Sequence, residues 1–255
     1  MTTDNPVWIF ATQNLVALSK FPAVCKLQLG GWKEIEYEPS EEPAIRALDV
    51  LPLLRQYRGA CTALHLFLPK PTLTRLVIDF CRPEELISQL VEGHVHITVL
   101  HANVDDLDRN ALSTICRCLP ALIELRMRVF VGIEDGEYED GINPRATDFF
   151  STFTNIPNLP STLQRLTVSW EFEFESEYVE DIPVASPENI PDFPAIGDKL
   201  RERCPALRTL WLDGHDFMFR WRQVLDREEV EQEDSNGATE IASCREGFED
   251  FWEGR

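Results

Sequence analysis

The stretch LPALIELRM, residues 119–127, decides how the chain folds, because its pattern returns twice further along. Residues 159–168 read LPSTLQRLTV and residues 204–212 read CPALRTLWL. Each copy has a proline followed by Leu-x-x-Leu-x-Leu, with Met or Val replacing the last leucine in two of them. A turn that is repeatedly followed by alternating apolar residues predicts a strand that recurs along the chain.

The second leucine of the pattern measures the length of the repeat. It falls at Leu27, Leu76, Leu100, Leu125, Leu166 and Leu210. The middle intervals are 24 and 25 residues, the last two are 41 and 44, and the first, 49 residues, is close to two units. Helical patterns lie between the copies, as in PEELISQLV from Pro83. In leucine-rich repeats, units of about 20–29 residues each give one strand to a curved parallel sheet and one helix to its back.

We therefore predict an α/β fold, a leucine-rich-repeat-like solenoid with irregular repeats of about 24–44 residues. Its curved, mostly parallel sheet is backed by helices and occupies residues 1–225. Residues 226–255 form an acidic C-terminal tail that we expect to be partly disordered, because they carry eleven acids and three bases. Phe217, Phe219 and Trp221 are expected to close the end of the core before this tail.

Several single elements are also predicted from local patterns. Helices are expected over residues 5–20 and 44–57, and two neighbouring strands over residues 64–68 and 73–80. Asp105 is expected to cap the helix that ends near Cys118. The apolar residues Val168, Trp170, Phe172 and Phe174 alternate with glutamates, which predicts a strand that projects past its neighbours.

The chain is strongly acidic, with 44 acidic and 24 basic residues and a net charge of −20. This charge repels nucleic-acid backbones and anionic membranes, so we expect neither as a partner. The acids are concentrated in insertions and in the tail: residues 134–148 hold six acids and one base, and residues 171–192 hold eight acids and no base. The repeat body itself is close to neutral.

The seven scattered cysteines do not form a disulfide framework, which favours a reducing compartment. The first residues, MTTD, lack the basic segment of a signal peptide, and no run approaches the roughly 20 apolar residues that span a bilayer. We expect an intracellular protein, cytoplasmic or nuclear.

LPALIELRM, LPSTLQRL and CPALRTLWLDGHDFMFRWR resemble the repeat region of fungal F-box and leucine-rich-repeat proteins. In that family CP-x-L-x-x-L-x-L units are common, and a Trp-x-Arg-like close, here Trp221-Arg222, follows the last unit. The resemblance covers roughly residues 15–225 and implies a protein-binding repeat domain. F-box members also carry a Leu-Pro-x-Glu-like motif that recruits a Skp-type adaptor of ubiquitin ligases, and no such motif precedes Phe21.

Three patterns invite a chemical interpretation. His94, His96 and His101 lack a completing acid or cysteine, and we expect ordinary surface histidines rather than a metal site. Cys116 and Cys118 are too closely spaced for the usual zinc or redox pair and are expected to pack in a helix. The acidic run at residues 134–141 does not match a calcium loop and is expected to be solvated.

No metal, cofactor or catalytic residue is predicted. The chain has no phosphate-binding loop, no Gly-x-Ser-x-Gly elbow and no nucleophile with a base in a motif context. We therefore expect a non-enzymatic protein-interaction module, either a substrate-recognition protein of the F-box type or a free-standing binding protein. A hydrolase or transferase whose site has no recognisable motif is the alternative.

The candidate partner-binding site follows from strand geometry. Residues that flank the second leucine of each strand face away from the core, because side chains alternate across a strand. These positions hold Arg75, Glu124, Arg126, Arg128, Arg165, Thr209, Trp211 and Asp213. The four arginines would form a positive stripe edged by acidic loops, and arginine and tryptophan often anchor protein interfaces. In the alternative interpretation, the arginines pair with carboxylates of the acidic insertions.

Overall fold

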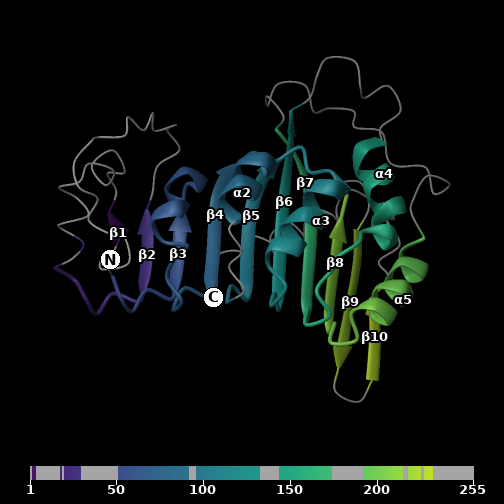
Figure 1. The fold of residues 1–255 in the computed structure, drawn as a ribbon. Coiled ribbons are helices and arrows are strands. Elements are labelled where there is room, and N and C mark those ends of the chain that lie inside the picture. Colours follow the sequence, from purple (N-terminus) through teal and green to yellow (C-terminus); the bar gives the residue numbers. More distant parts are fainter. Residues whose placement is uncertain are drawn as a thin grey trace.

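The computed structural model describes residues 2–3, 18, 20–29, 51–91, 96–132, 144–173, 192–214, 218–224 and 227–231. These residues form one ten-stranded sheet whose strand order follows the chain (Figure 1). The strands are β1 (Thr2–Thr3), β2 (Lys26–Leu29), β3 (Gln56–Gly59), β4 (Arg75–Cys81), β5 (Val99–Asp105), β6 (Glu124–Gly132), β7 (Arg165–Glu173), β8 (Thr209–Asp213), β9 (Met218–Val224) and β10 (Arg227–Glu231). Strands β1 to β8 are parallel, whereas β9 and β10 are antiparallel to their neighbours.

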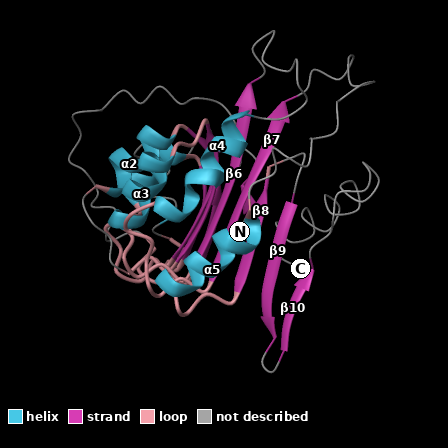
Figure 2. Ribbon diagram, turned by 90° about the vertical axis from the view of Figure 1, so that its right-hand side faces the viewer, coloured by secondary structure: helices cyan, strands magenta, loops and turns pink. Residues whose placement is uncertain are grey.

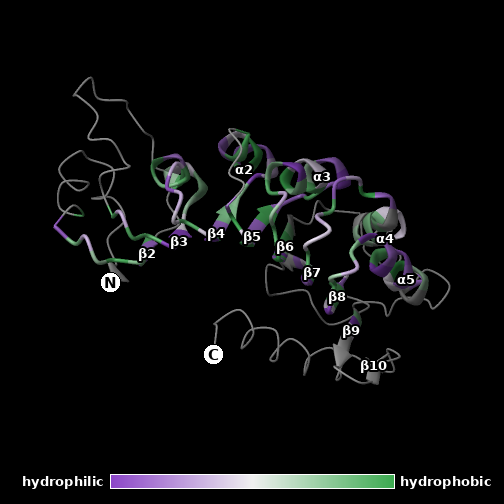
Figure 3. Cartoon of the chain, turned by 60° about the horizontal axis from the view of Figure 1, so that its bottom comes forward, coloured by the Kyte–Doolittle hydropathy of each residue, from purple (hydrophilic) through white to green (hydrophobic). Residues whose placement is uncertain are grey.

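Helices connect the parallel strands and lie on one face of the sheet (Figures 2 and 3). They are the 3-10 helices η3 (Cys61–Leu66) and η4 (Phe153–Asn155) and the α-helices α2 (Pro83–Leu90), α3 (Arg109–Cys118), α4 (Pro144–Thr152) and α5 (Phe193–Arg203). Parallel strands need such crossovers, since a tight turn can only join antiparallel ones. The described fold is therefore of the α/β class, with a mostly parallel sheet.

The core is built from the leucines that measured the repeat. Across the sheet, Leu27, Tyr57, Leu76, Leu100, Leu125, Leu166 and Leu210 lie in one row of paired positions. All seven are buried. This confirms the alignment on the second leucine. Tyr57 takes the place of a leucine in the additional unit between Leu27 and Leu76, where the interval is close to two units long. Its ring stacks on Phe67 at 5.1 Å between centroids, and its hydroxyl donates to the Ala60 carbonyl at 2.8 Å.

Two of the local predictions were wrong between residues 51 and 68. The predicted helix over residues 44–57 does not extend through its described part, where a turn leads into β3. Residues 64–68 do not form a strand, because Leu64, Phe67 and Leu68 lie in and after the 3-10 helix η3, which packs its apolar side chains onto the sheet. The strand predicted over residues 73–80 is present as β4. Of the helix predicted over residues 5–20, residues 5–17 lie outside the described residues.

The cap of α3 also differs from the prediction. Asp108, rather than Asp105, accepts a hydrogen bond from the Ala111 amide at 2.6 Å and thereby begins the helix. Asp105 is the last residue of β5 and is committed to the sheet. The predicted long strand is β7, but it does not project alone, since β6 pairs with it over its whole length.

The prediction that aromatic residues of this segment close the end of the core is confirmed for the residues that the structure describes. Phe219 and Trp221 of β9 are buried in the core cluster, and Phe217 lies outside the described residues. The sheet continues beyond residue 225, because β10 pairs with β9. The boundary predicted at residue 225 therefore falls before the last described strand. Within the described ranges, no helix is long and apolar enough to cross a bilayer.

Candidate functional site

The sheet face opposite the helices carries the polar residues of the strands, and we call it the polar face. Alternation along each strand places Leu125 and Met127 in the core and turns Glu124, Arg126 and Arg128 to the polar face. In β7 and β8 the paired positions are Arg165 and Thr209, Thr167 and Trp211, and Ser169 and Asp213. All eight predicted site residues therefore share this face: Arg75, Glu124, Arg126, Arg128, Arg165, Thr209, Trp211 and Asp213.

A buried carboxylate, Glu124, is the centre of this face. Its Oε1 lies 2.7 Å from Nε2 of His101 and 2.7 Å from Nε of Arg126, and its Oε2 accepts a hydrogen bond from Arg165 at 3.0 Å. The side chains of His101, Glu124 and Arg126 are 4%, 7% and 9% exposed, whereas that of Arg165 is 59% exposed. We call these four residues the Glu124 cluster. Three neighbouring strands supply its members, so their spacing is set by the sheet.

The electrostatics of the cluster fix its protonation. Burial alone would raise the pKa of Glu124, but the hydrogen bond from His101 and the charge of Arg126 outweigh it and lower this pKa to about 2. Burial lowers the pKa of His101, despite the hydrogen bond to Glu124. At pH 7 the imidazole is therefore neutral and donates its Nε2 proton to the carboxylate. Burial, together with neighbouring arginines, lowers the pKa of Arg126 to about 10, which leaves it charged.

Arg75 adds a third guanidinium group beside the cluster. It lies in the same row as Glu124, with Val99 of β5 between them. Its positive charge contributes to lowering the pKa of both His101 and Arg126, so the three groups are electrostatically coupled. The Arg75 Nε atom is buried and has no hydrogen-bond partner. Three guanidinium groups thus surround one carboxylate, which leaves this part of the polar face positively charged.

Two smaller groups flank the cluster. Towards the carboxyl ends of the strands, Arg128 forms an ion pair with Glu171 and lies over the ring of Phe130, 5.1 Å from its centroid. Towards β9, the guanidinium of Arg220 lies 5.2 Å from the Trp211 ring centroid. Trp211 is buried and Arg220 is exposed. The polar face therefore carries cations along several strands, held by carboxylates or by aromatic rings.

The structure brings the predicted residues together unevenly. Glu124, Arg126 and Arg165 are in direct contact, and Arg75 and Arg128 lie on either side of them. Thr209 and Asp213 line the same face on β8. The alternative interpretation was that the arginines pair with carboxylates of the acidic insertions. Arg128 does so, through Glu171, whereas Arg126 and Arg165 pair with Glu124 of the repeat body.

His101 is the functional candidate that the sequence prediction misjudged. It was expected on the surface, but it is 3% exposed and bonded to Glu124. The repeat spacing could have placed His101 on the polar face, because it lies one repeat of 25 residues before Arg126. In the structure the two residues are paired across β5 and β6. Glu171 and Arg220 were also missed. His94 lies outside the described residues, as does the acidic run at residues 134–141.

One hydroxyl-bearing side chain of the polar face shares a row of paired positions with His101. The hydroxyl-bearing Thr167 of β7 is in the same row as His101 but two strands away, about 10 Å at the usual strand spacing. That is well beyond hydrogen-bond reach of the imidazole. Among the described residues, no group of three His, Cys, Asp or Glu side chains could hold a metal ion. Cys116 is buried in α3, which raises its pKa to about 12 and fits the predicted packing role.

The fold and the polar face define an α/β protein with a charged, mostly parallel sheet. No family model matches the sequence, and no curated protein matches it either.

Proposed function

We propose that this chain is a leucine-rich-repeat-like solenoid that binds another protein through the polar face. Three features support the solenoid: the strands follow the chain order, the leucines of successive units share one row, and the described helices lie on the other face. In such an architecture each unit contacts its neighbours and the sheet offers an extended surface to a partner.

The Glu124 cluster carries the proposal. It concentrates positive charge on a chain whose net charge is −20, and two of the arginines on this face, Arg165 and Arg220, are exposed to solvent. Buried partners hold the geometry of this surface, so that its exposed cations are already positioned before a partner arrives. Complementary charge speeds encounter and selects partners, and we expect a partner segment rich in carboxylates.

The test compares proteins captured by the intact chain with those captured by two charge-reversal variants. Arg165→Glu alters the polar face, and Arg117→Glu makes the same change on the exposed surface of α3. We expect the first variant to lose the captured partners and the second to retain them. Equal capture by all three proteins, with equal thermal stability, would reject the polar face as the binding surface.

The resemblance to F-box proteins extends the proposal to substrate recognition in a ubiquitin ligase, in an intracellular setting. Direct titration of the chain with a purified Skp-type adaptor tests this extension. Micromolar or tighter binding supports it. If the adaptor does not bind while the polar face still captures a partner, the chain is a free-standing binding protein.

A further inference from the structure

The tryptophan of the polar face, Trp211 of β8, is buried by something other than the core. Trp211 is 5% exposed, yet it is not a member of the core cluster. Leu210 and Leu212 on either side of it point into the core, so the indole points to the polar face. The described helices lie on the opposite side of the sheet (Figures 2 and 3). A tryptophan on an uncovered sheet face would expose much of its ring, so other groups must lie over Trp211.

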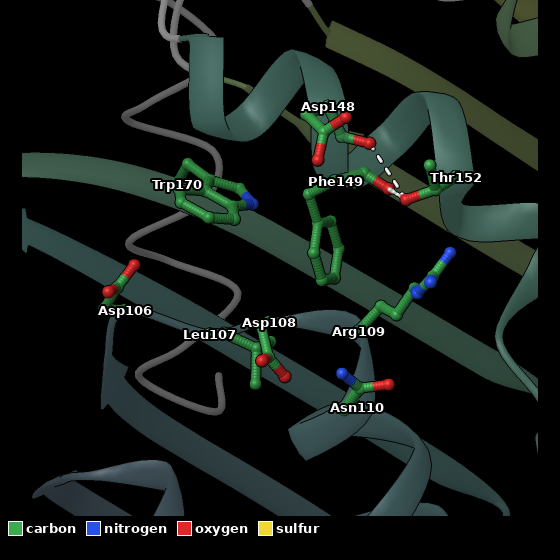
Figure 4. Close-up of a pocket in the computed structure, with 9 residues that line it drawn as sticks. All are labelled: Asp106, Leu107, Asp108, Arg109, Asn110, Asp148, Phe149, Thr152 and Trp170. Carbon is green, nitrogen blue, oxygen red and sulfur yellow. Dashed lines mark hydrogen bonds between the residues drawn. The ribbon is translucent and has the colours of Figure 1, made fainter.

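Trp170 of β7 shows how the helical side buries a ring of the same kind. It points towards the helices, where it lines a pocket together with Phe149 and Asp148 of α4 (Figure 4). The ring centroids of Phe149 and Trp170 are 5.5 Å apart, and both residues belong to the core cluster. On the polar face, none of the described helices packs in this way against Trp211.

The residues beside Trp211 are buried as well. His101, Arg126, Thr167 and Trp211 occupy one row of paired positions from β5 to β8. Their exposed fractions are 3%, 7%, 2% and 5%. The guanidinium of Arg220 covers part of the indole, 5.2 Å from the ring centroid, but Arg220 is itself exposed. A buried centre beside exposed charged groups is the pattern of a covered interface.

The chain leaves the described sheet next to this buried centre. Glu231, the last residue of β10, pairs with Arg220, which in turn pairs with Trp211. Glu231 therefore lies two strands, about 10 Å, from Trp211. Residues 232–255 follow it and lie outside the described residues. Fully extended, they would span about 80 Å, whereas β5 is about 25 Å from β10 across the sheet.

Residues 232–255 have a composition that suits this centre. They carry seven acids and two bases, and the aromatic residues Phe248, Phe251 and Trp252 lie among the acids. The polar face offers guanidinium groups around a buried indole, so the acids would meet opposite charge and an aromatic ring would pack on Trp211. The acidic insertion between β7 and α5 fits less well, because its far end is held at α5 on the helical side.

We propose that residues 232–255 bind back onto the polar face of their own chain. Their aromatic side chains lie over Trp211, and their carboxylates lie beside the exposed guanidinium groups of Arg165 and Arg220. The polar face therefore recognises an acidic segment that contains aromatic residues, and a protein partner of this chemistry would compete with the chain's own segment. The contact itself lies within one chain and does not depend on that partner.

Photo-crosslinking within the intact chain tests this contact. Benzoylphenylalanine is placed at position 248 or 251, an equal mixture of unlabelled and ¹⁵N-labelled chains is irradiated, and mass spectrometry of tryptic peptides locates the crosslinks. We expect crosslinks to Thr167, Ser169 or Trp211 that join peptides of the same isotopic label. Benzoylphenylalanine at position 21, an exposed phenylalanine before β2, should give no crosslinks to these residues.

A charge reversal on each side of the sheet provides the matched control. Arg220→Glu, beside Trp211, should lower the crosslink yield from position 251 about threefold, whereas Arg117→Glu on the exposed surface of α3 should leave it unaltered. Crosslinks confined to the helical side, crosslinks that join labelled to unlabelled chains, or equal yields from the two variants would each overturn the proposal. If the polar face captures a partner while these crosslinks are absent, the contact within the chain is rejected and the proposed function stands.

Discussion

Glu124 is the residue on which the polar face depends. Its pKa of about 2 reflects the hydrogen bond from His101 and the charge of Arg126. A carboxyl whose pKa is lowered by folding contributes stability above its unfolded pKa, near 4.5, and this contribution is lost as the pH falls towards 2. We expect Glu124→Gln to lower the free energy of unfolding at pH 7 by about 2–3 kcal/mol, because it leaves Arg126 buried beside a neutral group.

Urea unfolding at pH 7 and pH 3.5 measures this effect. The difference between Glu124→Gln and the unaltered chain should shrink at the lower pH, where the carboxylate contributes less. Asp79→Asn serves as the control, because Asp79 forms a more exposed ion pair with Arg58 and should cost less than about 1 kcal/mol. A pH-independent difference would show that the ionised carboxylate does not stabilise the fold.

The buried imidazole of His101 should also titrate differently from an exposed one. Because burial lowers its pKa, the midpoint of its titration in NMR spectra of its ring protons should lie below the ordinary value of about 6.5. The unfolded chain takes up the proton first, so His101 makes the fold less stable as the pH falls below about 6.5. A ring that titrates above 6.5 would contradict the assigned neutral Nε2–H donor.

The position of most single site residues could be predicted from strand alternation, but their contacts could not. Arg126 and Arg165 were predicted on the polar face because each is next to a leucine that points into the core, and side chains alternate along a strand. The contacts of His101 are with Glu124 and Arg126 on the neighbouring strand β6, which no local pattern reveals. Glu171 was expected in a strand, alternating with apolar residues, and it lies in β7, but its ion pair with Arg128 depends on the pairing of β7 with β6.

The beginning of helix α3 can be tested by comparing its observed cap, Asp108, with the predicted cap, Asp105. Asp108 accepts a hydrogen bond from the Ala111 amide, so Asp108→Ala should lower the free energy of unfolding by about 1 kcal/mol. Asp105→Ala should have a smaller effect, since Asp105 belongs to β5. Thermal and urea unfolding of the two variants measure this difference. A larger loss of stability for Asp105→Ala would show that Asp105 caps the helix, as predicted from the sequence.

β3 shows where element prediction failed. Its sequence, QYRG, is only four residues long and contains one apolar side chain, so neither alternation nor hydrophobicity reveals a strand. It forms because it pairs with β2 and β4, which place Tyr57 between Leu27 and Leu76 in the row of buried leucines. Gly59 is its last residue, and a Cβ atom at this position would approach the Tyr57 hydroxyl to 2.8 Å, so the site has no room for a side chain. Such constraints come from the tertiary structure.

In the whole molecule, β9 closes the end of the hydrophobic core, and β10 lies beyond it in the sheet. Trp221 pairs with Leu210 and is 5% exposed. We expect Trp221→Ala to lower the free energy of unfolding by about 3–5 kcal/mol, because it removes a large core side chain. Val91→Ala, at a site that is 64% exposed, should change it by less than about 0.5 kcal/mol. Urea unfolding measures both, and a small effect at Trp221 would mean that β9 does not complete the core.

The α/β class and the parallel sheet could be predicted because the leucine pattern recurs at nearly constant intervals in the middle of the chain. The lengthened units were harder to interpret, since α4 begins at Pro144 inside a window that looked like an acidic loop. Predicting the contacts within the site would have required both the repeat spacing and the register between strands that are far apart in sequence.

Site-specific photo-crosslinking shows which face of the chain lies against a bound protein partner. A benzoylphenylalanine at position 209 lies on the polar face, and one at position 117 lies on α3. Because we propose that the partner binds the polar face, we expect it to crosslink from position 209 and not from position 117. Crosslinking from position 117 alone, or from neither position while the partner remains bound, would contradict it.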